Sequence, residues 1–110
     1  MSPRPRRADR VAPLFAALGD VTRLGLVARL SAGGSVSVTQ LTAGSGVTRQ
    51  AVSKHLRVLA GAGLVRGSRR GRQSLWRLEP RRLDEARRSL DHLSRQWDEA
   101  LGRLKMLVEE

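Results

Sequence analysis

SVTQLTAGSGVTRQAVSKHLRVLAGAGLV, residues 37–65, is the part of this chain from which its architecture can be worked out. Ser37 and Gln40 have the Ser-x-x-Gln spacing of a capping box, which predicts a short helix that runs to about Ala43. Gly44-Ser45-Gly46 follows and predicts a tight turn, because glycine adopts the backbone conformations that turns require.

A second helix is predicted directly after this turn. Thr48 is placed to cap its first turn, the body spans Arg49–Ala60, and Gly61-Ala62-Gly63 marks its end. Two short helices joined by a turn of three or four residues that contains glycine are typical of a helix-turn-helix. This pattern alone occurs in many proteins, so its interpretation depends on the segments around it.

A β-hairpin is predicted over Leu64–Leu78, immediately after the helix-turn-helix. Leu64-Val65 begins an extended run, and Leu75-Trp76 lies in the returning strand. The tip, Arg69-Arg70-Gly71-Arg72, is polar and holds one glycine, but it does not match the favoured two-residue turns. The turn and its flanks are basic and hold Arg66, Arg69, Arg70, Arg72 and Arg77. The order helix, helix, basic hairpin predicts a winged helix within a mostly α fold.

The charge of the chain is concentrated in one part of it. The net charge is +11, from 21 Lys and Arg residues against 10 Asp and Glu residues. All of the excess lies within residues 1–80, whereas residues 81–110 hold equal numbers of basic and acidic residues. A surplus of this kind indicates a polyanionic partner. We therefore expect residues 11–80 to form a winged helix-turn-helix domain that binds double-stranded DNA.

The helix Arg49–Ala60 has an apolar and a polar face. The positions expected to point inward are Val52, Leu56 and Leu59, with Ala51 and His55 beside them. On the polar face, Arg49, Gln50 and Ser53 lie near the start of the helix, the part that reaches base edges in a major groove. Arg pairs with guanine, Gln with adenine and Ser with either base. We therefore expect these three side chains to read the DNA sequence.

Contacts with the DNA backbone are expected from two further places. Thr48, Lys54 and Arg57 flank the base-reading positions, and their side chains are suited to hold phosphates. The cations at the tip of the hairpin are expected to follow the backbone or to enter the minor groove: Arg69, Arg70 and Arg72. The sequence thus predicts a DNA interface formed by one helix and one wing.

The segments before the helix-turn-helix are expected to be scaffold. Residues 1–10 mix Pro and Arg and predict a flexible basic arm. Val11–Leu18 has apolar residues at helical spacing, with Gly19 as a C-terminal cap. Asp20 is placed to cap a second helix, which Gly33-Gly34 ends. The residues expected on the buried side of this helix are Leu24, Val27, Ala28 and Leu30.

Residues 81–110 predict one long helix, from about Arg81 to Val108, after Pro80 ends the hairpin. Its apolar residues form a heptad repeat, with Leu83, Leu90, Trp97 and Leu104 at one position and Ala86, Leu93, Ala100 and Leu107 at the other. A helix lying on its own core would show a similar stripe, but the core is expected to be complete before it. We therefore expect a homodimer with an interface of Leu83, Leu90, Leu93, Trp97, Leu104 and Leu107.

Several classes of function are disfavoured. The chain has no Cys, which excludes disulfides, thiolate metal sites and redox-active thiols. No apolar run approaches the roughly 20 residues of a membrane span, and the N-terminus lacks the apolar stretch of a secretory signal, so a cytoplasmic location is expected. Neither His55 nor His92 has a partner set for catalysis. We predict that the chain is not an enzyme and has no metal site and no cofactor.

Three parts of the chain resemble the ArsR/SmtB family of dimeric repressors. Leu14–Leu24 is similar to the family's second-helix signature. Val52–Leu59, followed by Ala62–Val65, is similar to its recognition helix and strand entry, and Gly71–Leu78 is similar to its wing. The resemblance covers roughly residues 11–80. It implies a homodimer that binds a partly palindromic operator and blocks transcription until a signal releases it.

The chain also departs from the family in its sensing sites. The family's thiolate motif falls at Ser35–Leu41, where no Cys is present. Its other metal site uses Asp, His and Glu ligands on the C-terminal helix, and here His92 is the single His of that helix, beside Asp91. Adjacent residues project in different directions on a helix, so His92 is expected to be exposed rather than a ligand. The chain therefore resembles a subgroup that lacks the usual metal ligands.

Two other functions remain alternatives. A sequence-independent nucleoid protein would also have a basic surface, whereas a specific regulator should prefer its operator over random duplex by at least about 10³. A protein-interaction module would use the heptad helix and bind DNA only incidentally. An inducer, if one exists, is expected to be a small molecule or a partner protein.

Overall fold

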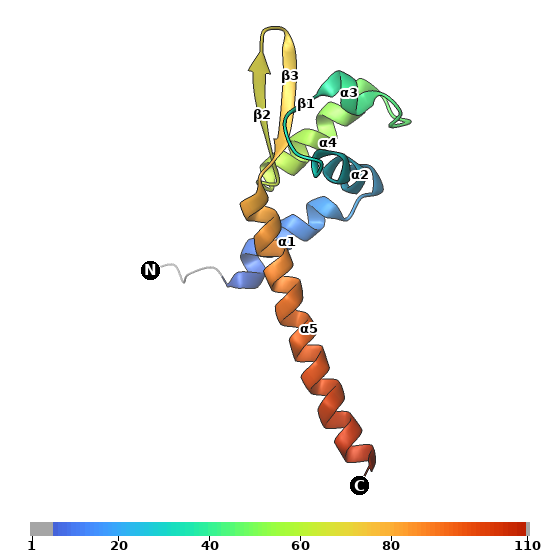
Figure 1. Ribbon diagram of the computed structural model, residues 1–110, viewed down its shortest axis with the longest axis vertical. Helices are drawn as coiled ribbons and strands as arrows, with labels where there is room; N and C mark the ends of the chain where they lie inside the picture. The colour runs from blue at the N-terminus through green and yellow to red at the C-terminus, as the bar shows by residue number, and fades with distance from the viewer. Residues whose placement is uncertain (1–5, 110) are drawn as a thin grey trace.

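The computed structural model describes residues 6–109, which form helices around a small antiparallel sheet (Figure 1). The elements in chain order are α1 (Arg7–Leu18), α2 (Val21–Leu30), β1 (Val36–Ser37), α3 (Val38–Thr42), α4 (Arg49–Gly61), β2 (Val65–Arg70), β3 (Gln73–Leu78) and α5 (Pro80–Glu109). The helix-turn-helix and the hairpin lie at one end of the molecule, and the free end of α5 lies at the other (Figure 1). This arrangement confirms the predicted class, a mostly α winged helix-turn-helix with a long C-terminal helix.

Helix α1 begins at Arg7, earlier than the sequence predicted. The Asp9 carboxylate accepts a hydrogen bond from the backbone amide of Arg6 at 3.1 Å, which satisfies a donor at the helix start. The flexible arm predicted for residues 1–10 is therefore wrong from Arg7 onward. Residues 1–5 lie outside the described part of the chain.

Asp20 caps α2 as predicted, because its carboxylate accepts hydrogen bonds from the backbone amides of Thr22 and Arg23 at 2.9 and 3.0 Å. The prediction of the buried face was wrong at Leu24 and Ala28, which are both exposed. The residues that α2 buries are Leu26, Val27 and Leu30. Apolar residues lie on more than one side of this helix, so its packing against α1 and α4 sets the buried side.

The helix-turn-helix forms as the sequence predicted. The Ser37 hydroxyl accepts a hydrogen bond from the Gln40 amide at 3.1 Å, and the Gln40 side chain accepts one from the Ser37 amide at 3.2 Å, which completes the capping box. The turn after α3 bends at Gly44 and Gly46, whose φ angles are 74° and 76°. The Thr48 hydroxyl then caps α4 by accepting from the amide three residues ahead at 3.1 Å.

The tip of the hairpin differs from the prediction. The two strands remain paired up to Arg70 and Gln73, so the loop is Gly71-Arg72 alone. Gly71 has a φ of 63°, whereas Arg72 keeps a negative φ. A two-residue loop with glycine at its first position is one of the favoured hairpin turns. The predicted mismatch was wrong because the four-residue tip was not divided into strand ends and loop.

The sheet has a third strand that the sequence did not predict. β1 pairs with β3 through Val36 and Trp76, so β3 is the central strand in the order β1-β3-β2. On the other side, Gly67 of β2 stands opposite Trp76. A Cβ atom at Gly67 would lie 3.0 Å from carbon atoms of the Trp76 ring. Glycine at this position is therefore what allows the indole ring to lie across the base of the wing.

The core lies where α1, α2, α3, α4 and the base of the hairpin meet. Its fully buried side chains are Leu14, Leu30, Leu41, Val52, Leu56, Leu59 and Leu64. Among the described helices, none is by itself long and apolar enough to cross a bilayer, although α1 and α2 taken together, with a bend of 97°, meet the requirement of length and composition. In this fold, the apolar faces of both helices are part of the core.

The first turns of α5 also belong to this core. Ala86 is buried, and Leu83 packs partly buried against the core residues. The expectation of a core complete before this helix was therefore wrong, because α1 packs against α5. Leu83, predicted in a dimer interface, thus also packs against the core of its own chain. From Leu90 onward, α5 is exposed and extends away from the rest of the molecule (Figure 1).

Candidate nucleic-acid interface

Helix α4 rests on the core through one face and leaves the other face exposed. Val52, Leu56 and Leu59 are fully buried, as their spacing predicted. The predicted DNA-contacting side chains of the helix are exposed, except Ser53, which is half-buried: Arg49, Gln50, Ser53, Lys54 and Arg57. Because the buried residues fix the rotation of α4 about its axis, the polar residues are presented together as one surface.

The first turn of α4 contains the residue that caps the helix and two exposed polar side chains. The Thr48 hydroxyl oxygen accepts a hydrogen bond from the Ala51 amide, so this residue caps the helix. Its hydroxyl hydrogen can still be donated to a phosphate. Arg49 and Gln50 follow directly and are exposed at the positive end of the helix dipole, where negative charge is favoured.

The arginines of the wing differ in whether they form an ion pair. At the base, Arg66 Nε lies 3.3 Å from Oε1 of Glu79. The arginines near the tip are exposed: Arg69, Arg70 and Arg72. The tip and the N-terminal end of α4 both point away from α5 (Figure 1). The structure therefore brings the predicted helix and wing positions to the same end of the molecule.

The cations of this end have no acidic partner. Within residues 6–109, no hydrogen bond or ion pair engages the side chains of Arg49, Lys54, Arg57, Arg69, Arg70 and Arg72. Positive charges that are close together and unmatched by acids produce a positive potential over the surface. This surface is therefore suited to bind a polyanion.

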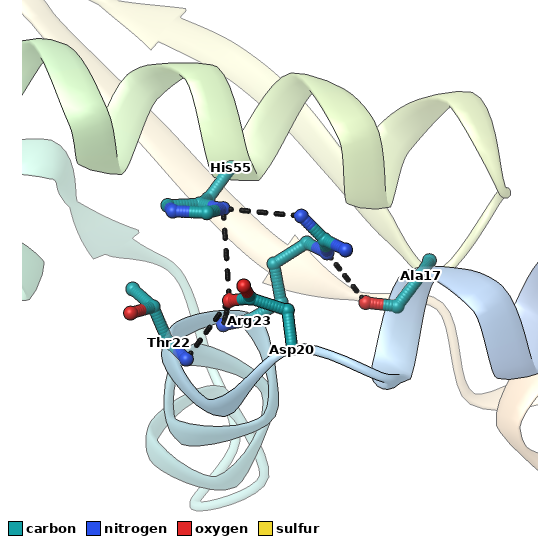
Figure 2. A network of polar contacts seen from close by, with 5 residues as sticks. All are labelled: Ala17, Asp20, Thr22, Arg23 and His55. Atoms are coloured by element: carbon teal, nitrogen blue, oxygen red, sulfur yellow. Dashed lines mark hydrogen bonds and ion pairs between the residues drawn. The ribbon is translucent and has the colours of Figure 1, made fainter.

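A polar network connects α4 to the helices beneath it (Figure 2). Arg23 of α2 donates from Nε to the carbonyl of Ala17, near the end of α1, at 2.6 Å. Its Nη1 lies 3.3 Å from Nδ1 of His55 in α4. Oδ2 of Asp20, the residue that caps α2, lies 3.9 Å from the same Nδ1 atom. One arginine therefore joins α1, α2 and α4.

Nδ1 of His55 thus faces two groups of opposite charge. The Arg23 guanidinium can only donate hydrogen bonds, and the Asp20 carboxylate can only accept them. The pKa of Asp20 is lowered from its ordinary value, chiefly by the hydrogen bond from the Arg23 amide, with desolvation opposing and the Arg23 charge assisting. The contact confirms the predicted structural role of His55. The roles of Asp20 beyond its cap and of Arg23 were missed, because neither lies near α4 in sequence.

Arg29 was also missed by the sequence reasoning. Its Nη1 donates to the carbonyl of Leu41 at 2.6 Å and to that of Ala43 at 3.3 Å, and its Nη2 donates to that of Gln40 at 2.7 Å. The last carbonyl groups of a helix have no partner within the helix. Arg29 thus holds the end of α3 against α2 and positions the turn that leads to α4.

Comparisons with known proteins agree with this geometry. Residues 18–68 match the family model described as a helix-turn-helix domain. The chain is 39% identical over 104 residues to the HTH-type transcriptional regulator Rv2034 of Mycobacterium tuberculosis, which covers 94% of this chain and 91% of that protein. An ArsR-like transcriptional regulator from Rhodococcus sp. RHA1 is 33% identical, with a TM-score of 0.73 and coverage of 89% of this chain and 92% of the other. The chain belongs to the ArsR family of transcriptional regulators.

A second solved structure supports the same placement of this ArsR-family regulator. The transcriptional repressor BigR from Xylella fastidiosa is 33% identical, with a TM-score of 0.63 and coverage of 74% of this chain and 83% of the other. The resemblance inferred from three segments of the sequence is thereby confirmed. The helix-turn-helix of this ArsR-family chain is its DNA-binding domain.

The regulator exposes an apolar surface on the outer part of α5. Of the residues predicted for a dimer interface, all except Leu83 are exposed within the single chain: Leu90, Leu93, Trp97, Leu104 and Leu107. Leu101 is exposed as well and was missed, because it lies outside the two heptad positions. These six exposed residues are called the α5 stripe below. A contiguous exposed apolar surface is typical of an interaction site.

His92 lies beside this stripe, in a setting that offers no ligand set. It is exposed, as predicted, and its neighbours in the cleft between α1 and α5 include Phe15 and Leu93. Within the described part of the chain, no group of three or more His, Cys, Asp or Glu side chains is placed to hold a metal ion.

Proposed function

We propose that this ArsR-family chain is a sequence-specific, dimeric DNA-binding repressor. In this proposal α4 enters a major groove, with Arg49, Gln50 and Ser53 at base edges. The residues that hold the backbone or reach the minor groove are Thr48, Lys54 and Arg57 of α4 and its cap, together with Arg69, Arg70 and Arg72 of the wing. Base contacts supply specificity, and the other contacts supply position and affinity.

The observation that carries this proposal is the unpaired positive charge of α4 and the wing. An arginine that serves only the fold generally has an acidic or carbonyl partner, as Arg23 and Arg29 do here. The exposed cations of α4 and of the wing tip have no such partner among the described residues. A duplex offers regularly spaced phosphates to side chains of this kind, and binding releases the counterions condensed on DNA.

Dimerisation is proposed from the α5 stripe. A helix that exposes Trp97 and Leu104 to water forgoes the free energy that burial of these side chains would provide. A second copy offers the same stripe, and a two-fold interface uses the same surface on both subunits. Two α4 helices related in this way would reach half-sites about 34–36 Å apart, which fits a partly palindromic operator.

Repression is proposed from the likeness to BigR, whose name describes it as a transcriptional repressor. The physical basis is occupancy, since a dimer that covers an operator excludes other proteins from the same duplex. Release would then require an inducer, either a small molecule or a partner protein, that favours a conformation with lower affinity for DNA.

The proposal is tested by selecting duplexes from a random-sequence pool with the full chain. We expect one partly symmetric motif, bound with a preference of at least about 10³ over random duplex. Equal affinity for all duplexes would contradict specific recognition and would favour the sequence-independent nucleoid protein. Charge reversal of Arg49 and Arg57 should abolish binding, and unchanged cellular activity of that variant would favour a protein-interaction module instead.

A further inference from the structure

We propose that the groove between α3 and the wing binds the phosphate backbone of one DNA strand. The groove has a volume of about 680 Å³, and α3 lies beside the wing in the fold (Figure 1). Apart from Leu75, the side chains that line it are polar: Ser35, Ser37, Thr39, Gln40, Arg70 and Gln73. Of these residues, only Arg70 belongs to the DNA-contacting set named above, so the groove adds a second group of contacts to that set.

The polar side chains of the groove offer hydrogen-bond donors that the fold leaves unused. Thr39, Arg70 and Gln73 are exposed, and no hydrogen bond or ion pair within residues 6–109 engages their side chains. Gln40 is oriented by the capping box, because its Oε1 accepts hydrogen bonds from the Ser37 amide at 3.2 Å and from the Ser37 hydroxyl at 3.3 Å. Its Nε2 group therefore remains available to donate.

The charge of the groove selects the class of partner. Its lining combines a guanidinium group with hydroxyl and amide groups and includes no acidic side chain. A phosphodiester carries one negative charge and accepts hydrogen bonds from groups of these kinds. The groove lies at the same end of the molecule as the N-terminal end of α4 (Figure 1). A duplex that accommodates α4 in its major groove therefore supplies a phosphate backbone beside α3 and the wing.

A pair of like charges extends the same face of the wing. Residues directly opposite each other on paired strands share one face of a sheet, and every second residue along a strand returns to that face. Arg70 stands opposite Gln73, and Arg66 stands opposite Arg77, so all four lie on the face that forms the groove. Two cations directly opposite each other destabilise a sheet. Glu79 pairs with Arg66 at 3.3 Å, whereas Arg77 has no partner among the described residues.

The like-charge pair is an observation independent of the groove lining, and it indicates the same partner. A phosphate that approaches this face would offset the repulsion between the two guanidinium groups. Arg77 is exposed, so a backbone that leaves the groove can reach it along the wing. We therefore assign Thr39, Gln40, Gln73 and Arg77 to the contacts that position the duplex.

This inference rests on the proposed function, because α4 must dock against a duplex before the backbone reaches the groove. Phosphate contacts fix the register and orientation of a protein on DNA, but they carry no sequence information. The residues of the groove should therefore affect affinity for all duplexes alike. Their effect can be measured on random duplex as well as on a selected operator, which separates the groove from sequence-specific recognition.

The test is a set of duplexes in which single phosphates are replaced by neutral methylphosphonates. With the parent protein, we expect each half-site to contain a phosphate beside the groove whose neutralisation weakens binding by about tenfold, because charge-assisted hydrogen bonds are lost. Thr39→Val and Gln73→Leu should each weaken binding to the unmodified duplex by about tenfold. Neutralising that same phosphate should then have little further effect in either variant, while the other contacted phosphates keep theirs. A merely structural role would not produce this coupling.

Two glutamines provide a matched control for charge. Gln73→Glu and Gln96→Glu each add one negative charge at an exposed side chain, but Gln96 lies on α5, outside the groove. Gln73→Glu should weaken DNA binding by about 10²-fold, because the new carboxylate repels the phosphate in both subunits, whereas Gln96→Glu should have little effect. Thermal unfolding of both variants should match the parent protein, since neither glutamine side chain has a partner within the described chain.

Arg77→Ala provides a readout that does not depend on the position of a phosphate. It should lower the slope of log affinity against log salt by about two per dimer, because each subunit then releases about one counterion fewer from the DNA. An unchanged slope would remove Arg77 from the contacts with the backbone.

The proposal is overturned if Thr39→Val and Gln73→Leu bind DNA like the parent, if their losses add fully to neutralisation at every phosphate, or if the two glutamate variants have the same effect. A selected operator motif together with any of these results would contradict the groove alone. Coupled losses on random duplex, without a selected motif, would support the groove and contradict sequence specificity alone. Absence of all DNA binding would overturn both.

Discussion

The two ends of this molecule hold their charge in opposite ways. At the end formed by α4 and the wing, Arg49, Lys54 and the wing-tip arginines have no acidic partner among the described residues. Along α5, cations pair with acids three or four residues away, as Arg87 does with Asp84 and Lys105 with Glu109. The first end therefore carries a net field, whereas the second carries balanced charge beside an apolar stripe.

The acids of the basic part sharpen this contrast. Residues 1–80 contain only Asp9, Asp20 and Glu79, and each is engaged within the fold. Asp9 and Asp20 accept hydrogen bonds from backbone amides at the starts of α1 and α2, and Glu79 pairs with Arg66. None of them neutralises the exposed face of α4. The difference between the two ends indicates a polyanion as the partner of the first and an apolar protein surface as the partner of the second.

Salt should affect the two ends very differently. If a dimer places 6–10 basic side chains against phosphates, operator affinity should fall by roughly 10³–10⁵ between about 50 and 200 mM salt. Self-association through the α5 stripe should stay the same or strengthen slightly, because apolar burial does not depend on ion screening. Fluorescence anisotropy and sedimentation equilibrium at both salt concentrations measure the two effects. Operator binding that does not respond to salt would contradict the proposed role of the unpaired cations.

Trp97→Arg should dissociate the dimer and weaken operator binding by about 10²-fold or more, because binding of one α4 helix then no longer holds a second α4 helix at high effective concentration near its half-site. Met106→Arg is the matched control, since Met106 is also exposed and apolar. It lies nine residues further along, which places it half a turn away from the stripe. Sedimentation velocity and operator titrations should separate the two variants. A dimer that survives Trp97→Arg would refute the assignment of the interface.

Arg49→Ala and Arg72→Ala divide the first end into its two kinds of contact. Arg49→Ala should cost about 1–3 kcal/mol of operator binding and relax the preference at one base position. Arg72→Ala should weaken all duplexes alike and reduce the slope of the salt dependence. Selection from a random pool with each variant measures both outcomes. An unchanged motif with Arg49→Ala would remove this residue from base recognition.

Asp20→Asn tests the acid that stands beside α4, and its effect should be the smallest of these. The pKa of Asp20 is depressed in the folded protein, chiefly by the hydrogen bond from the Arg23 amide. Its charge therefore contributes stability that is fully present above the unfolded pKa of about 4 and is lost as the pH falls through the lower folded value. Asn also caps helices, so the free energy of unfolding of the variant should be only slightly lower than that of the parent protein at pH 7. The two values should become equal at acidic pH. Urea unfolding at several pH values measures this, and a constant difference would contradict it.

Local patterns were sufficient for the parts of the fold that depend on neighbours in sequence. The capping box at Ser37 and Gln40, the cap at Thr48 and the buried spacing of Val52, Leu56 and Leu59 follow from contacts within a few residues. The unequal distribution of charge is likewise a property of composition alone. These features predicted the winged helix-turn-helix and its exposed polar face.

Contacts between distant segments could not be obtained in this way. The pairing of β1 with β3, the burial of Leu26 instead of Leu24, and the placement of Leu83 on the core all depend on which elements pack together. The same applies to the contact of Arg23 with His55 and to the packing of α1 against α5, which lie at opposite ends of the chain. Periodicity states which side of a helix is apolar, but it does not state what covers that side. For α4 and the wing, the sequence was enough to predict the exposed basic surface, because these cations have no partner within the described chain. For α5, the heptad pattern continues along the helix, and only the tertiary packing distinguishes the turns that join the core from the turns that remain exposed.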